Sequence, residues 1–218
     1  MYLASASPRR IAFLLGLGLE VSVSTPPANS EPEPFPGEDP ASYTLRAAQA
    51  KADAVQPLIA ADLFSGATAP DATKGLPVII AADTVVVLEN RILGKPEDPA
   101  KAMAMISSLA GKTHSVITGC IITPLSCPAR SGDRVHGLAP RAFAVQSRVT
   151  MWDCPPGILL AYANSGEPLD KAGAYAVQGA GAFLVQSVHG SWSNVVGLPL
   201  AELLQALLEM RVVAPLVE

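Results

Sequence analysis

Residues 78–83, Val-Ile-Ile-Ala-Ala-Asp, decide the fold of this chain. Five apolar residues in a row, closed by one acid, are typical of a strand that is buried on both faces of a sheet. Because ligands gather at the carboxyl ends of strands in open α/β sheets, we expect Asp83 to stand where the chain leaves the sheet, beside a cleft. A carboxylate there can hold a divalent metal ion or act as a general base. From this stretch alone, an ordinary turn aspartate is an equal alternative.

Strand-like and helix-like patterns alternate on both sides of this run. Residues 85–88 and 91–93, separated by Glu89 and Asn90, predict a hairpin. Hairpins that occur together with interleaved helices favour a mixed sheet over a purely parallel one. The sequence therefore predicts an α/β fold with a mixed, central, twisted sheet flanked by helices. The other strands are expected at 19–24, 113–123, 142–151, 175–178 and 183–188, and the helices at 8–16, 40–55, 98–110, 156–164 and 200–210.

Three stretches predict loops rather than regular elements. Residues 26–40 contain six prolines, which cannot join the interior of a sheet. Two further stretches are rich in small and turn-forming residues and are interpreted as surface insertions, at residues 60–76 and 124–140. The irregular sequence of the first begins at about Leu58. We expect residues 1–218 to form a single domain that carries these two insertions.

The composition limits the classes of function. Half of the 218 residues are hydrophobic, 16% are charged, and the net charge is −4. This balance argues against a nucleic-acid-binding protein, whose surface would be strongly basic. Residues 11–23, the most apolar early stretch, are too few to span a membrane. Cys120, Cys127 and Cys154 show no metal-ligand or disulfide spacing, so we expect free thiols in a cytoplasmic protein without a membrane segment.

The first ten residues combine small hydroxyls with two cations at a predicted helix start. Ser7 can cap the helix, and Pro8 suits its first position. Arg9 and Arg10 are unusual there, because a helix N-terminus already carries a partial positive charge. An anion such as a phosphate chain that docks beside Ser5 would explain them. A capped helix with two solvated arginines is the alternative from these residues alone.

Further polar residues could contact an anionic ligand. Lys95 lies between Gly94 and Pro96, but the spacing of a P-loop is absent. Residues 167–175 are the densest polar cluster, and Gln178 just after it offers an amide donor and acceptor that could pair with a nucleobase edge. A charged turn before an edge strand is the alternative. His114 is interpreted as structural, and the absence of a G-x-S-x-G motif argues against a serine nucleophile.

Taken together, these segments resemble the Maf family of nucleoside triphosphate pyrophosphatases. The resemblance rests on six blocks in order along the chain, at residues 3–10, 82–86, 94–96, 109–119, 167–179 and 190–199. It implies a fold like that of the Maf and inosine triphosphate pyrophosphatases, with a cleft at the strand ends. It also implies hydrolysis of the α–β phosphoanhydride of a nucleoside triphosphate, with Mg²⁺ or Mn²⁺ as cofactor.

The resemblance also implies roles for single residues. Asp83 matches the acid taken as general base and metal ligand. Arg9, Thr84 and Gln178 match positions linked to substrate choice, in the form of the branch that acts on dTTP and UTP. The family often has an Asp-Glu pair after the second strand, and here either Glu31 or Glu33 could supply that metal-binding carboxylate. The remaining substrate-binding matches are Ser5, Arg10, Lys51, Lys95, Asp170 and Lys171.

Other functions stay open at this stage. The same chemistry could act on a modified or non-standard nucleotide, or on 7-methyl-GTP. A non-catalytic protein that senses nucleotides or regulates cell division could use the same pocket. We expect a nucleoside triphosphate as the partner, with no nucleic acid and no membrane, and leave a homodimer open.

Overall fold

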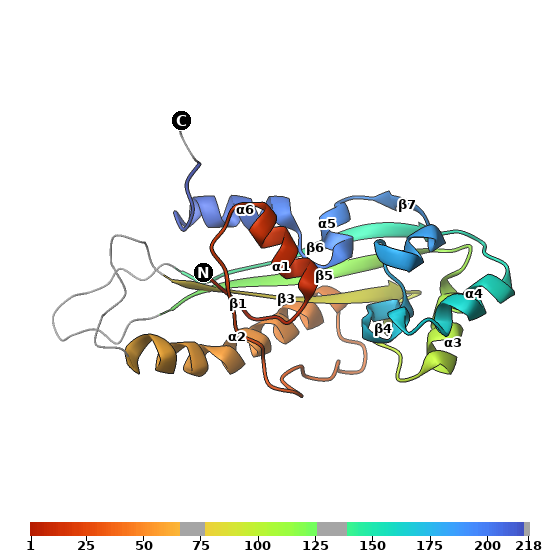
Figure 1. Cartoon of the computed structure of the whole chain (residues 1–218), viewed down its shortest axis with the longest axis horizontal. Helices are drawn as coiled ribbons and strands as arrows, with labels where there is room; N and C mark the ends of the chain where they lie inside the picture. The colour runs from red at the N-terminus through yellow and green to blue at the C-terminus, as the bar shows by residue number, and fades with distance from the viewer. Residues whose placement is uncertain (66–76, 126–138, 216–218) are drawn as a thin grey trace.

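The computed structural model describes residues 1–65, 77–125 and 139–215, in which a central sheet carries helices on both faces (Figure 1). The sheet order is β2-β1-β3-β5-β6-β7, and β4 pairs with β3. The strands are β1 (Tyr2–Leu3), β2 (Ser22–Val23), β3 (Val78–Leu88), β4 (Arg91–Leu93), β5 (Thr113–Pro124), β6 (Arg141–Met151) and β7 (Val185–His189). The helices are α1 (Pro8–Gly16), α2 (Pro40–Ser65), α3 (Pro99–Leu109), α4 (Pro156–Ala163), α5 (Trp192–Val196) and α6 (Leu200–Glu209), with 3₁₀ turns η2 (Glu167–Asp170), η3 (Ala172–Ala174) and η4 (Gly179–Leu184).

The sheet is mixed, as predicted. Strand β1 runs parallel to β2 and β3, whereas β3, β5, β6 and β7 are successively antiparallel. The predicted hairpin of β3 and β4 is also confirmed. The α/β class with helices flanking a central sheet is therefore confirmed.

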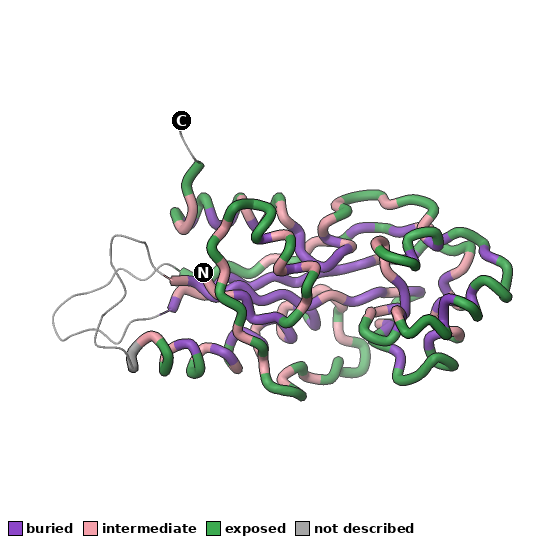
Figure 2. Tube along the Cα trace, viewed as in Figure 1, coloured by how far each residue is buried: buried purple, intermediate pink, exposed green. Residues whose placement is uncertain are grey.

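Strand β3 is the buried centre of the sheet, and its core is purple in Figure 2. Because successive side chains point to opposite faces, Ile80 and Ala82 pack against the side of α1 and α6, and Ile79 and Ala81 pack against α2. The same alternation continues into the next two residues. Asp83 therefore belongs to the α2 face and Thr84 to the α1 face.

The predicted position of Asp83 at the end of a strand is wrong. Strand β3 continues past the acid to Leu88, and its pairing with β5 extends to Val87 opposite Ser115. Asp83 lies in mid-strand directly opposite Gly119, where an added Cβ would stand 2.6 Å from the backbone of Thr44. Glycine thus lets helix α2 lie close against the sheet beside the acid.

Helix α2 is longer than predicted. Ile59 is buried and Leu63 packs beside it, so the apolar stripe of the helix continues past the expected end at Val55 and past Pro57. The interpretation of residues 58–65 as irregular is therefore wrong, and residues 66–76 lie outside the described residues. Of the second proposed insertion, Pro124 belongs to β5, and residues 126–138, which include Cys127, lie outside the described residues.

Two other differences concern the C-terminal third of the chain. Residues 175–178 form no strand, because Gly173 and Ala174 take positive φ angles and turn the chain while Tyr175 packs inward. Strand β7 begins at Val185 because residues 179–184 form η4. The short helix α5 was not predicted, and Ser191 caps it by accepting a hydrogen bond from the amide of Asn194.

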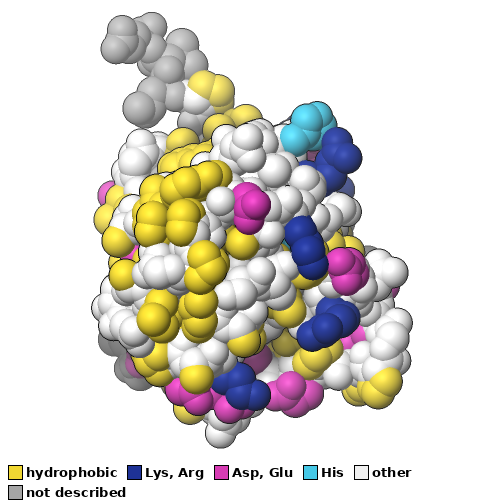
Figure 3. Space-filling view, turned by 90° about the vertical axis from the view of Figure 1, so that its right-hand side faces the viewer, with side chains coloured by type: hydrophobic (Ala, Val, Ile, Leu, Met, Phe, Trp, Pro, Cys, Tyr) yellow, Lys and Arg dark blue, Asp and Glu magenta, His cyan; other side chains and the backbone are white. Residues whose placement is uncertain are grey.

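Figure 3 shows one face of the molecule, on which Lys and Arg side chains are interspersed with Asp and Glu. They do not form one continuous positive patch in this view, and exposed apolar side chains lie beside them. Ile158 and Leu160 of α4 are among the exposed apolar residues of the chain. In the described part of the chain, none of the helices combines the length and the apolar character that a membrane span requires.

Candidate active site

A cleft of about 1020 Å³ brings together segments that are far apart in the sequence. Its walls come from the β1–α1 turn, the proline-rich loop, strand β3, the loop after β4 and the segment 170–178. Every residue that the sequence singled out for the site lines this cleft: Ser5, Arg9, Arg10, Glu31, Glu33, Lys51, Asp83, Thr84, Lys95, Asp170, Lys171 and Gln178. The cleft lies at the carboxyl ends of β1, β2 and β4, as predicted, but it meets β3 at Asp83 in mid-strand rather than at its end.

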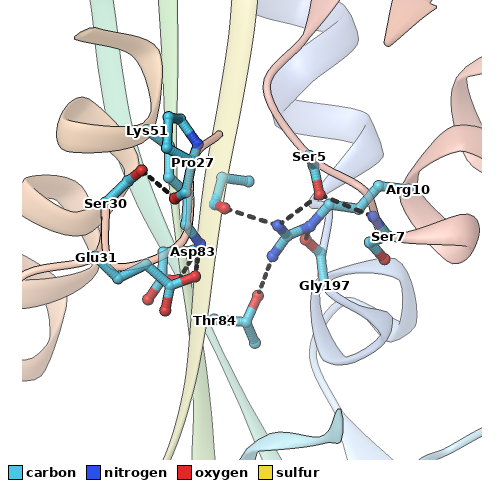
Figure 4. A network of polar contacts seen from close by, with 11 residues as sticks. Ser5, Ser7, Arg10, Pro27, Ser30, Glu31, Lys51, Asp83, Thr84 and Gly197 are labelled. Carbon is cyan, nitrogen blue, oxygen red and sulfur yellow. Dashed lines mark hydrogen bonds and ion pairs between the residues drawn. The ribbon is translucent and has the colours of Figure 1, made fainter. Parts of the chain in front are cut away.

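Two carboxylates converge on one ammonium group at the α2 side of the cleft (Figure 4). Lys51 Nζ lies 2.6 Å from Asp83 Oδ1 and 2.8 Å from Glu31 Oε1. Lys51 and Asp83 are buried, whereas the side chain of Glu31 is 45% exposed. Lys51 comes from α2, seven residues after Thr44, and therefore lies on the helix side that passes over Gly119. The 2.6 Å contact with Lys51 fixes the direction of the Asp83 carboxylate.

The electrostatics of this corner follow from the same charges. Burial alone would raise the pKa of Glu31, but the charge and hydrogen bond of Lys51, with the charge of Lys95, hold it below its usual value. Burial, with the nearby charges of Asp83 and Glu31, raises the pKa of Tyr43 to about 12. Tyr43 lines the cleft and was not predicted. The corner therefore concentrates negative charge around a single lysine.

The donor set fits a hard divalent cation. Among residues 1–65, 77–125 and 139–215, no group of three or more His, Cys, Asp or Glu side chains could hold a metal by itself. Mg²⁺, however, is commonly bound by one or two carboxylates, with water and substrate phosphates as its other ligands. Asp83 and Glu31 already converge on one positively charged nitrogen. They are the described carboxylates that would hold such an ion.

Arg10 is turned into the protein beneath the cleft (Figure 4). Its Nε donates to Gly197 O at 2.8 Å, and its Nη1 donates to Ala82 O at 2.7 Å. Its Nη2 donates to Thr84 Oγ1 at 3.1 Å. Burial lowers the pKa of Arg10, against the opposing effect of the Asp83 charge. These bonds make Arg10 a tie between α1, β3 and the end of α5, with most of its donors already used.

Ser5 and Ser7 shape the turn that holds these arginines. Ser5 Oγ accepts a 3.1 Å hydrogen bond from the amide of Ser7 and lies 3.4 Å from Arg10 Nη1. Ser7 occupies the cap position of α1 without a side-chain capping bond. Ser7 therefore takes the predicted N-cap position, but its side chain does not form the predicted capping bond.

The first and last parts of the site meet at Asp170. Arg9 Nη1 lies 3.9 Å from Asp170 Oδ2, and Lys171 Nζ donates to Asp170 Oδ1 at 2.6 Å. Burial would raise the pKa of Asp170, but the hydrogen bond and charge of Lys171 and the charge of Arg9 keep it below its usual value. Lys171 Nζ also donates to the backbone oxygen of Glu167 at 2.7 Å. Two cations thus face the cleft on either side of one acid.

The remaining predicted residues lie along the rim. Lys95 and Glu33 are exposed, and Gln178 is half-buried. The amide of Gly173 donates to Gly94 O at 3.0 Å, which joins the Lys95 loop to the segment that leads to Gln178. Thr84 is half-buried and forms a hydroxyl pair with Thr118 of β5 at 2.9 Å. Thr118 lies within the block at residues 109–119, but the sequence analysis gave it no role. Its position beside Thr84 follows from the register of β3 on β5, which the sequence does not give.

Comparison with known proteins gives one consistent result. The family described as Maf-like protein matches residues 1–210. The chain is 48% identical to a dTTP/UTP pyrophosphatase of Nitratidesulfovibrio vulgaris (strain Hildenborough), over 94% of this chain and 85% of that protein. It is 43% identical to a dTTP/UTP pyrophosphatase of Oleidesulfovibrio alaskensis, over 98% of this chain and 86% of that protein. It is also 43% identical to the protein of the same name from Myxococcus xanthus, over 96% and 91% of the two chains.

Proposed function

The chain belongs to the Maf family, and on that premise we propose that it is a pyrophosphatase that hydrolyses dTTP and UTP to the nucleoside monophosphate and pyrophosphate. The match of this family to residues 1–210 confirms the resemblance inferred from the sequence blocks. Relatives that are 43–48% identical over nearly the whole chain bear the name dTTP/UTP pyrophosphatase. The single observation that carries the proposal is the cleft in which Asp83 lies among Arg9, Lys51, Lys95 and Lys171.

The charges of the cleft suit a triphosphate. A triphosphate carries about four negative charges, and attack by water brings a further oxygen toward them. Positioned cations offset this repulsion and stabilise the charge that develops in the transition state. Arg9 and Lys171 line the cleft beside Asp170, and Lys95 lines it close enough to Glu31 for its charge to act on that carboxylate. We assign Lys95 and Lys171 to the phosphate chain.

Asp83 is assigned as the general base. Its carboxylate accepts a proton from the attacking water, and the water oxygen then bonds to the α-phosphorus while the pyrophosphate leaves. Lys51 orients Asp83 through the 2.6 Å contact. Asp83 and Glu31 are the carboxylates that would hold Mg²⁺ or Mn²⁺, which would supply positive charge to the phosphate oxygens. General-base help of this kind is typically worth about 10² to 10⁴ in rate.

Substrate choice is assigned to Thr84, Gln178 and Arg9. All three line the cleft, and Thr84 lies on the opposite face of β3 from Asp83. The Gln178 amide can donate a hydrogen bond to a carbonyl oxygen of uracil or thymine.

A cytoplasmic location is also proposed. Cys120 and Cys154 are buried free thiols, and burial raises the pKa of Cys120 to about 12. Unpaired thiols are typical of a reducing compartment. Pairing of two copies stays a prediction, which light scattering of the purified protein tests.

The test is release of pyrophosphate from a panel of triphosphates. Purified protein is given dTTP, UTP, CTP, 7-methyl-GTP and inosine triphosphate with Mg²⁺, with Mn²⁺ or with a chelator. We expect pyrophosphate rather than orthophosphate, the highest kcat/KM for dTTP and UTP, and loss of turnover with the chelator. A preference for 7-methyl-GTP or inosine triphosphate would overturn the substrate, and binding without release would indicate a nucleotide sensor.

A further inference from the structure

Thr84 and Thr118 form a hydroxyl pair between the cleft and the interior. They are direct partners in the antiparallel pairing of β3 with β5, so their side chains share one face of the sheet. Their Oγ1 atoms lie 2.9 Å apart. Thr84 lines the cleft, whereas Thr118 is fully buried behind it. The pair therefore joins a residue of the cleft wall to a residue buried behind it.

The partners of the pair fix the direction of every hydrogen bond. Thr118 Oγ1 lies 3.0 Å from the backbone oxygen of Asn194, and a carbonyl oxygen can only accept. The single proton of Thr118 is thus used there, so Thr84 must donate its own proton to Thr118. Arg10 Nη2 donates to Thr84 Oγ1 at 3.1 Å. Thr84 is left with one free lone pair and no proton to offer toward the cleft.

The far end of this chain of bonds is held in place. Asn194 is fully buried, and its Nδ2 donates to Val116 O at 3.1 Å and to Ser147 Oγ at 3.0 Å. Its backbone amide binds Ser191 Oγ at 3.2 Å. The backbone oxygen of Asn194, which accepts the hydrogen bond from Thr118, is therefore held in place. The polarity of Thr84 is set by the fold rather than by the ligand.

We propose that Thr118 is a positioning residue that keeps Thr84 a pure hydrogen-bond acceptor, and that this acceptor receives the N3–H of uracil or thymine. This inference rests on the proposed function. N3–H is the hydrogen-bond donor common to the pairing edges of uracil and thymine. In cytosine the N3 atom carries a lone pair, which would face the lone pair of Thr84. Buried polar groups that meet without a hydrogen bond give strong discrimination.

The first test compares Thr118→Val with Thr118→Ser. Valine keeps the shape of threonine but cannot accept a hydrogen bond. In Thr118→Val the Thr84 hydroxyl therefore becomes free to donate a hydrogen bond to the base. We expect the kcat/KM ratio of UTP to CTP to fall at least about fivefold in Thr118→Val, since a hydrogen bond is worth about this much. The Thr118→Ser variant should keep the wild-type ratio within about twofold, because serine retains the hydroxyl. An unchanged ratio in a folded Thr118→Val protein would overturn the proposal.

The second test does not depend on folding of the Thr118 variant. Wild type and Thr84→Val are each measured with UTP and N3-methyl-UTP, which lacks the N3 proton. We expect methylation to lower kcat/KM at least about threefold more in wild type than in Thr84→Val, as for two groups in contact. An equal loss in both proteins would exclude the N3–H contact. Dissociation constants of α,β-methylene-UTP and its N3-methyl form give the same comparison without turnover, so a failure of hydrolysis is told apart from a failure of this inference.

Discussion

Lys51 Nζ and Asp83 Oδ1 lie 2.6 Å apart, across 32 positions of sequence. Both side chains are buried, and the same ammonium reaches Glu31 at 2.8 Å. A buried carboxylate is expensive unless it is paired, so Lys51 is what allows an acid in the middle of a central strand. The pair fixes the position of Asp83 in the cleft. The predictions below test this arrangement and its surroundings.

Glu31 and Glu33 can be told apart by a matched pair of substitutions. Glu31 contacts Lys51 beside Asp83, whereas the side chain of Glu33 is exposed and its backbone oxygen accepts a hydrogen bond from Arg46. We expect Glu31→Gln to raise the Mg²⁺ or Mn²⁺ concentration needed for half-maximal activity at least about tenfold, since a metal ligand is weakened. Glu33→Gln should change it less than about twofold. The reverse order would assign the metal-binding carboxylate to Glu33.

Arg9 should affect nucleotide binding rather than folding. Its 3.9 Å contact with Asp170 is long, and Asp170 is exposed, so the pair adds little stability. We expect Arg9→Ala to raise KM about tenfold, the effect of losing one charged hydrogen bond, or to change the preference among triphosphates. Arg91→Ala, at an exposed arginine of β4, is the control. Kinetics that match wild type on every triphosphate would refute a role for Arg9.

His114 should make stability depend on pH. Burial lowers its pKa to about 4, and its Nε2 lies 2.6 Å from the hydroxyl of buried Tyr175. The unfolded chain binds a proton near pH 6.5, which the folded chain does not bind until about pH 4. The free energy of unfolding should therefore fall as pH drops through that window.

Urea unfolding at several pH values measures this effect. The His114→Gln variant should lose that part of the pH dependence, whereas His189→Gln, at an exposed histidine, should keep it. A slope that persists in His114→Gln would assign the effect to another group.

Gly119 should resist substitution because of the close approach of α2. An added Cβ would stand 2.6 Å from the backbone carbon of Thr44, which cannot move alone. We expect Gly119→Ala to destabilise the protein by about 1 to 3 kcal/mol and to lower activity, since α2 carries Lys51. Gly157→Ala in α4 is the matched control, because nothing lies within 4 Å of the new Cβ. Equal stability of the two variants by urea unfolding would contradict this account of the α2 contact.

The sequence predicted the fold where apolar runs and turn residues are clear. The buried run at 78–82, the hairpin at Glu89 and Asn90 and the capped helix at Asp98 are all seen. The end of β3 could not be predicted from Asp83, because a carboxylate in mid-strand is tolerated here through its ion pair with Lys51. The length of α2 was missed because Pro57 resembles a helix end, although Ile59 and Leu63 still pack on the sheet.

The residues of the site were identified from the sequence by resemblance, and the structure brings them to one cleft. Their separate roles stay predictions. What spacing alone cannot give is the contact between Lys51 and Asp83, which depends on where α2 crosses Gly119. The link from Thr84 to Thr118 depends in the same way on the register of β3 and β5.

The most direct test of the account is the turnover of dTTP by Asp83→Asn. Asparagine keeps the size of the side chain but cannot take a proton from water, so we expect a loss of at least about a hundredfold in kcat. Circular dichroism and thermal unfolding check that the variant is folded, and Asp53→Asn, at an exposed acid of the same helix as Lys51, is the control. Pyrophosphate release at least a hundredfold slower in folded Asp83→Asn, with Asp53→Asn near wild type, is the predicted result. Release at close to the wild-type rate would contradict the assignment of Asp83 as the general base.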